Sequence, residues 1–145
     1  MAAALNGVIV VDKPKGPTSH DVVAAVRRWA RPSRTGHTGT LDPMATGVLP
    51  VCLGAVTRLS RFLSRGPKEY AGVITLGVRT DTDDAEGTVL SSAPAGAIRP
   101  GDLQRAASGL TGDLLQVPPR WSAKKIGGRR AYDLARAGGE PRPEP

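Results

Sequence analysis

Hydrophobic and polar positions in the first part of the chain follow two different periods. Residues 7–14 (GVIVVDKP) form a β-branched run that ends at a proline, which predicts a buried strand. Residues 18–30 then carry apolar side chains at helical spacing. Thr18 or Ser19 is expected as the N-cap, and Asp21 follows Thr18 by three residues, as in a capping box. The apolar face of this predicted helix consists of Val22, Val23, Val26, Trp29 and Ala30.

The later elements are shorter and less regular. A short helix is expected over 55–63, and residues 68–82 alternate as in an amphipathic strand, with an acidic hairpin turn after it. We further expect a helix over 102–110, a strand over 112–119 and a helix over 129–139. This irregular alternation favours an α+β fold with a mixed, mainly antiparallel sheet and flanking helices. A doubly wound fold is disfavoured because no G-x-G-x-x-G follows the first strand.

Composition and charge narrow the class of protein. The 145 residues suit one domain, and the formal net charge of +7 favours a polyanionic partner such as nucleic acid. The single cysteine, Cys52, excludes an internal disulfide and a multi-thiolate zinc site, and its apolar neighbours predict a small buried hydrophobe. Since neither a membrane-spanning stretch nor a signal peptide is recognisable, a cytoplasmic protein is expected.

One carboxylate stands in an unusual setting. In residues 36–47 (GHTGTLDPMATG), Asp42 is surrounded by glycines, small side chains and Pro43. The glycines permit positive φ or close approach of another molecule, and Pro43 restricts the backbone of Asp42. The segment therefore favours either a loop that presents Asp42 in one geometry or an ordinary tight surface turn.

Other candidate chemistry is weaker. The acidic cluster at 81–86 fails the calcium-loop pattern and is better explained as a solvated turn. Neither a P-loop nor a serine-histidine-aspartate motif is present. His37 could stack on a base or cap a turn, and Tyr70 could stack on a base or lie at the rim of a core.

Four ordered segments resemble the TruB-type tRNA pseudouridine synthases. They are GVIVVDKPKGPTSHDVV, RTGHTGTLDPMATGVLPVCLGAVTRLSRFL, KEYAGVITLGVRTDTDDAEG and QVPPRWSAKKIGGRRAYDLARAG. The resemblance implies the pseudouridine synthase fold and isomerisation of the uridine at position 55, in the T-arm loop of tRNA. It also implies catalysis without cofactor or metal and a target base that is flipped into a pocket.

The resemblance also implies roles for individual residues. Asp42 matches the catalytic aspartate, which either attacks the ribose C1′ or assists formation of a glycal-like intermediate. Tyr70 matches the tyrosine that stacks on the flipped uracil, with late proton transfer as a second candidate role, and His37 matches the histidine that fills the space the base vacates. Lys13 matches a lysine that supports the active-site loop, and it is grouped with the expected RNA-binding residues. The expected phosphate contacts are Arg34, Lys68, Lys124, Lys125, Arg129 and Arg130, although the last four also suit a solvated helix face.

Two departures from the family pattern qualify these expectations. Trp121 replaces a more common tyrosine. In addition, the family places a strand with an arginine that pairs with the catalytic aspartate, and usually a small C-terminal RNA-binding domain, beyond Gly139. We therefore expect residues 1–145 to be a partial catalytic domain that is weakly active or inactive alone. The alternatives are a non-catalytic tRNA-binding or RNA-chaperone protein of the same fold and a basic ribosome-associated module.

Overall fold

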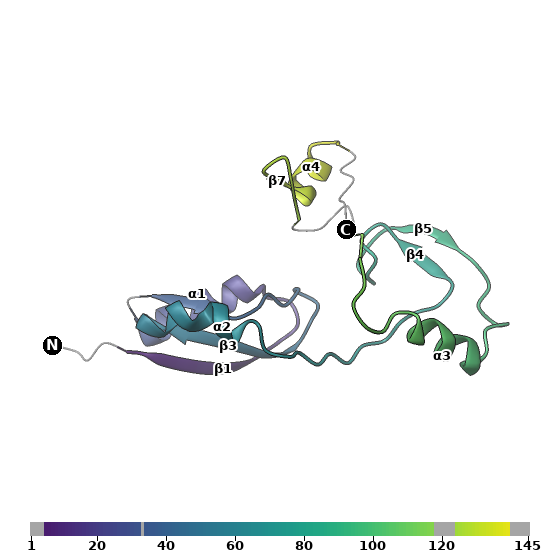
Figure 1. Cartoon of the computed structure of the whole chain (residues 1–145). Helices are drawn as coiled ribbons and strands as arrows, with labels where there is room; N and C mark the ends of the chain where they lie inside the picture. Colours follow the sequence, from purple (N-terminus) through teal and green to yellow (C-terminus); the bar gives the residue numbers. More distant parts are fainter. Residues whose placement is uncertain (1–4, 33, 118–123, 140–145) are drawn as a thin grey trace. The chain divides into compact units, whose positions relative to one another are not determined.

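The computed structural model describes residues 5–32, 34–117 and 124–139 (Figure 1). The chain divides into two units, Met1–Tyr70 and Ala71–Pro145, each of which is described by itself. The first unit contains the three-stranded sheet, the hydrophobic core packed against it and the loop that carries Asp42.

A three-stranded antiparallel sheet organises the first unit. Its strands are β1 (Gly7–Lys13), β2 (Thr35–His37) and β3 (Gly47–Leu53), in the order β1-β3-β2. Register places Lys13 opposite Gly47, so the end of β1 lies beside the start of β3. The 38–46 loop connects β2 to β3 and re-enters the sheet at Gly47, opposite the end of β1.

Helix α1 (Ser19–Ala30) begins as the sequence predicts. Thr18 is the N-cap, its hydroxyl accepts a hydrogen bond from the amide of Asp21, and the Asp21 carboxylate accepts one from the amide of Thr18. The hydroxyl and the amide of Thr18 both donate to Asp21, so they hold the pKa of its carboxyl below the ordinary value. The amides of Thr18 and Asp21 are thereby satisfied, which explains why the helix starts at this residue.

The core of the first unit lies between α1 and one face of the sheet. It is formed by Val22, Val23, Leu49, Val51 and Leu53. Val26 and Ala30 pack against it, as expected, but Trp29 is 79% exposed, so its assignment to the apolar face was wrong. Trp29 is about 100° around the helix from Ala30 and falls at the edge of the packed stripe.

The first strand is half-buried instead of fully buried. Ile9 and Val11 face the core, whereas Val8 and Val10 lie on the opposite, more exposed face of the sheet. The strand therefore alternates as in an antiparallel sheet covered on one side. Cys52 is completely buried, as expected, and burial raises the pKa of its thiol.

After β3 the chain forms two short helical turns. A 3-10 helix, η1 (Gly54–Leu59), leads directly into α2 (Ser60–Leu63), where a single short helix was expected. Arg58 and Arg61 on these turns are exposed.

The second unit contains small separate elements. Strands β4 (Val78–Thr80) and β5 (Val89–Ser92) form the expected hairpin, and α3 (Pro100–Ser108) follows with Asp102 as its third residue. The long strand predicted over 68–82 is wrong for residues 68–77, which have no strand partner in the part of the chain that the structure describes. An alternating sequence forms a strand only where a second strand accepts its hydrogen bonds.

The last described segment corrects two further predictions. Residues 112–117 are not a strand, while 118 and 119 lie outside the described residues. Strands β6 (Lys125–Ile126) and β7 (Arg129–Arg130) form a hairpin before helix α4 (Ala131–Arg136). The basic run is therefore not a helix face. Gly127 and Gly128 have φ of 56° and 83°, which favours a tight turn over continuation of a helix.

Candidate functional site

The 38–46 loop presents the Asp42 side chain to solvent. Asp42 is exposed, whereas Leu41 beside it packs against the core and Thr38 is buried. The amide of Ala45 donates to the carbonyl of Asp42 at 3.0 Å, which closes a turn directly after the carboxylate. The backbone is thus anchored on its inner side while the carboxylate points away from the core.

Lys13 is the largest fully buried side chain of the described residues, and it lies beneath this loop. Its ammonium Nζ donates to the carbonyls of Ala45 at 2.7 Å, Pro14 at 3.0 Å and Pro43 at 3.3 Å. These three acceptors match the three N–H donors of an ammonium group. Lys13 therefore ties the segment that directly follows Asp42 to the end of β1.

Ser19 provides a second anchor, which the sequence analysis missed. Its side chain is buried, and its Oγ accepts from the amide of Leu41 at 2.8 Å and donates to the carbonyl of Leu41 at 3.0 Å. Because Thr18 serves as the N-cap, the Ser19 hydroxyl is free to face the loop. The only signal for this role was a second hydroxyl residue next to the predicted cap.

Ser19 and Lys13 together fix the backbone on both sides of Asp42. The peptide groups of Leu41 are held by Ser19, and the carbonyls of Pro43 and Ala45 by Lys13. The amide of Gly16 also donates to the carbonyl of Pro43 at 2.8 Å. Three residues that flank the carboxylate are thereby held without any contact to the carboxylate itself.

We expect Ser19→Ala to lower the free energy of unfolding by about 1–2 kcal/mol, because the peptide of Leu41 loses two buried hydrogen bonds. Ser64→Ala serves as the control, because that hydroxyl donates only to the nearby carbonyl of Arg61. Urea unfolding of both variants measures the difference. Equal effects would contradict an anchoring role for Ser19.

Two other predicted site residues of the first unit, His37 and Lys68, lie next to the 38–46 loop. His37 ends β2, opposite Val51, and its Nδ1 is buried without a hydrogen-bond partner in the structure. Lys68 donates to the carbonyls of Ser64 and Gly66, and a methyl group placed on Gly39 would lie 3.6 Å from its Cε. Lys68 therefore passes beside the 38–46 loop.

The remaining candidates are divided between the two units. Tyr70 is 70% exposed and stands at the end of the first unit. Arg34 precedes β2 and is exposed. Lys124 and exposed Arg129 belong to the second unit, and no position relative to Asp42 is assigned to them.

The acidic turn between β4 and β5 is held by its own hydrogen bonds. The Thr82 hydroxyl donates to the Asp84 carboxylate at 2.7 Å and the amide of Glu86 donates to it at 2.9 Å. The hydroxyl of Thr82 in particular holds the pKa of Asp84 below its usual value. Within the described ranges, no three histidine, cysteine, aspartate or glutamate side chains are grouped as metal ligands, and no helix is long and apolar enough to span a membrane.

Comparison with known proteins assigns this arrangement to a family. The family model described as TruB family pseudouridylate synthase (N terminal domain) matches residues 27–145. The chain belongs to the TruB family. The TruB match includes the Asp42 loop and begins within α1, so the anchors Lys13 and Ser19 precede the matched region.

Similar full-length TruB proteins are named tRNA pseudouridine synthase B. The relative from Thermobifida fusca is 54% identical over 92% of this chain and 45% of its own length. The relative from Symbiobacterium thermophilum is 49% identical over 99% of this chain and 48% of its own length. The chain thus spans about half the length of the curated relatives it matches.

A solved structure also shares the TruB fold of this chain. A chain of the crystal structure of a Cbf5–Nop10–Gar1 complex superposes with a TM-score of 0.55 and 30% identity, over 82% of this chain and 31% of that one. The antiparallel α+β architecture expected from the sequence is confirmed.

Proposed function

We propose that this chain carries the nucleophile of a tRNA pseudouridine synthase that isomerises the uridine at position 55, in the T-arm loop. One observation carries the proposal: Asp42 is exposed on a loop whose backbone is held on both sides by buried Lys13 and Ser19. A nucleophile needs this combination, because it must reach the substrate and yet be fixed at attack distance.

The reaction is an isomerisation, so the uridine and its product have the same atoms. One carboxylate is enough to act as the nucleophile. The N1–C1′ bond of the uridine breaks, and the uracil turns and forms a C5–C1′ bond. C5 loses its proton and N1 gains one. Because a stacked base cannot turn in this way, the nucleotide is flipped out of the RNA. In this proposal Tyr70 stacks on the flipped uracil, and His37 fills the vacated space.

The RNA itself is held by the positive charge of the chain. The proposed phosphate contacts are Arg34, Lys68, Lys124 and Arg129, and the formal net charge of +7 supports a polyanionic partner. We further propose that turnover needs an arginine supplied by the additional length that the relatives possess. Such a cation would favour the ionised form of Asp42.

Release of tritium from tRNA labelled at uracil C5 tests this function. Two proteins are compared: the 145-residue chain, and the same chain joined to the C-terminal half of the Thermobifida fusca relative. We expect the extended protein to release tritium from uridine 55 and the chain alone to release far less. RNA binding by the extended protein without tritium release would instead favour the non-catalytic chaperone.

A further inference from the structure

Trp29 is an exposed aromatic side chain in the last turn of α1. Its side chain is 79% exposed, although burial of an indole ring would stabilise the chain. In the same unit the ring of Phe62 is also exposed, but the guanidinium carbon of Arg61 lies over it, 4.6 Å from the ring centroid. Within the described ranges Trp29 forms no such contact. Its indole therefore remains open to a partner from outside the unit.

Trp29 borders a small methyl group and a cation on the surface of α1. Ala25 lies one turn before Trp29, Arg28 lies directly before it, and both are exposed. On a helix these three positions fall within about 100° of one another, with Ala25 between the other two. The methyl group of Ala25 thus separates the indole from the guanidinium without covering either. Ala25, Arg28 and Trp29 are called the Trp29 surface below.

The positive charge of the Trp29 surface is not neutralised by its own helix. The single acid of α1 is Asp21, which lies about 10 Å from Arg28 along the helix axis. The Asp21 carboxylate accepts hydrogen bonds from Thr18 at the start of the helix. In the part of the chain that the structure describes, Arg28 forms no ion pair. A free cation beside an open aromatic ring suits a partner that combines negative charge with flat aromatic groups, which is the chemistry of a nucleic acid.

We propose that the Trp29 surface binds one unpaired nucleotide of the RNA. The indole of Trp29 stacks on the base, and Arg28 contacts the phosphate beside that base. Stacking tolerates any base, because every base has a π-face. Inside a duplex the bases stack on one another, so the indole requires an unpaired base or a strand end. The identity of the RNA rests on the proposed function, whereas the stacking contact is independent of the chemistry of Asp42.

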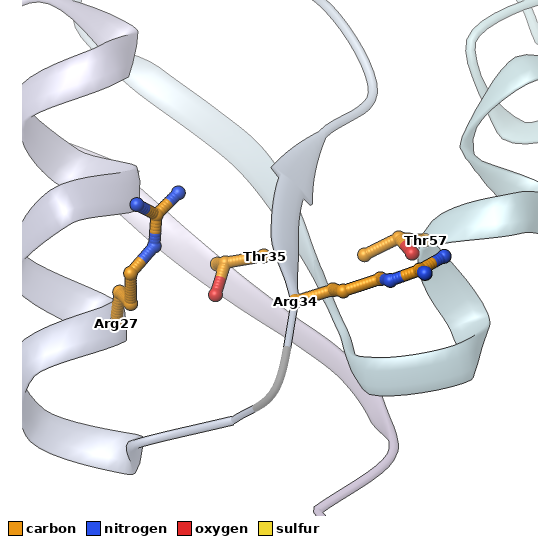
Figure 2. Close-up of a pocket in the computed structure, with 4 residues that line it drawn as sticks. All are labelled: Arg27, Arg34, Thr35 and Thr57. Carbon is orange, nitrogen blue, oxygen red and sulfur yellow. The ribbon is translucent and has the colours of Figure 1, made fainter.

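Arg27 provides the internal comparison for Arg28. It lies about 160° around the helix from Trp29, on the other flank of α1. It lines a pocket together with Arg34, Thr35 and Thr57. Figure 2 shows Arg27 on the side of α1 that faces Thr35 of β2. Arg27 and Arg28 therefore carry the same charge on neighbouring residues, but only Arg28 borders Trp29.

Binding of a fluorescent T-arm hairpin to the 145-residue chain tests the stacking contact. We expect Trp29→Leu to weaken binding about fivefold or more, and Trp29→Phe to bind within about threefold of the wild type because it keeps a π-face. Phe62→Leu is the control, since it removes an exposed ring that Arg61 already covers. The urea midpoint of Trp29→Leu should be unchanged. If Trp29→Leu binds no more weakly than Phe62→Leu, the proposal is overturned.

The salt dependence of the same binding tests the phosphate contact. We expect Arg28→Gln to weaken binding about threefold or more and to reduce the magnitude of the salt slope by about one. Arg27→Gln makes the same change of charge on the other flank and should have a smaller effect on both quantities. Equal effects of the two substitutions would contradict a phosphate held beside Trp29.

The emission of Trp29 reports on stacking directly. The chain has two tryptophans, so Trp121→Phe leaves Trp29 as the only fluorescent indole. We expect the T-arm hairpin to quench this emission more than a blunt duplex with the same number of phosphates. Equal quenching by both would show attraction by charge without stacking and would overturn the proposal. Equal quenching by an unrelated single strand supports the Trp29 surface and contradicts T-arm preference, whereas tritium release alone decides the catalytic proposal.

The competing explanation is that another part of the protein covers Trp29. The extended protein tests it, with Trp121 and any tryptophan of the added half replaced by phenylalanine. We expect acrylamide to quench Trp29 in this protein without RNA, and the T-arm hairpin to protect it. Protection of Trp29 before RNA is added would assign it to an interface within the protein and would overturn the proposal.

Discussion

Asp42→Asn is expected to lower the rate of tritium release by the extended protein by about three orders of magnitude or more, because an amide is a poor nucleophile. The substitution is nearly isosteric and the side chain is exposed, so we expect the free energy of unfolding to change by no more than about 0.5 kcal/mol. Affinity for the T-arm hairpin should stay within about twofold, since Asp42 contributes no attraction to phosphate.

Asp12→Asn provides the matched control for this experiment. Asp12 is also an exposed carboxylate of the first unit, near the end of β1, and its replacement makes the same change in net charge. Tritium release by Asp12→Asn should equal that of the wild type. Activity of Asp42→Asn within about tenfold of the wild type would refute the nucleophile assignment, since removal of a nucleophile costs far more.

The second large effect is expected at Lys13. Lys13→Met keeps most of the buried side-chain volume but leaves the carbonyls of Pro14 and Ala45 without this donor, while the carbonyl of Pro43 keeps only the amide of Gly16. Buried acceptors that lose their partner cost about 1–3 kcal/mol each, so we expect a loss of about 3–5 kcal/mol in the free energy of unfolding. A loss of this size is a large share of the stability of a small domain.

Lys15→Met is the control for Lys13→Met. Lys15 is exposed and lies two residues further along the chain, so the same chemical change there should alter the free energy of unfolding by about 0.5 kcal/mol or less. Urea unfolding and thermal melting compare the two variants. Similar stability of both would show that the buried ammonium is not an anchor of the first unit.

Asp42→Asn and Lys13→Met test two different parts of the 38–46 loop, its exposed carboxylate and its buried anchor. Lys13 and Ser19 act on the backbone at Leu41, Pro43 and Ala45, and Asp42 is the exposed side chain between them. Loss of the anchors should therefore reduce stability, whereas loss of the carboxylate should reduce turnover alone. Lys13 is a buried cation whose hydrogen bonds all go to backbone carbonyls. Because removing a cation from water is costly, it is tolerated in the interior only where all its donors have acceptors.

Local features of the first unit were predictable from neighbouring residues. The start of α1 depends on Thr18 and Asp21, which are three positions apart, and the structure confirms the cap. The face of α1 was mostly correct, but the exposure of Trp29 depends on how far the sheet extends beneath the helix, which periodicity does not report.

Predictions that depended on distant partners were less successful. The alternating segment around Tyr70 has the pattern of a strand, yet residues 68–77 pair with no strand among those described. The basic run at Lys125 and Arg129 forms a hairpin because two adjacent glycines adopt positive φ, although its composition also suited a helix.

The sequence by itself determined the family, the single carboxylate of the 36–47 segment, Asp42, and the capping of α1, because these depend on residue identity at short spacing. Only the tertiary structure revealed that Ser19 and Lys13 meet the Asp42 loop, and that Arg27 and Arg34 line one pocket. Lys13 and Ala45 are 32 positions apart, and their contact follows from the register of β1 with β3. Contacts of this range arise when the chain packs, so no local pattern of residues encodes them.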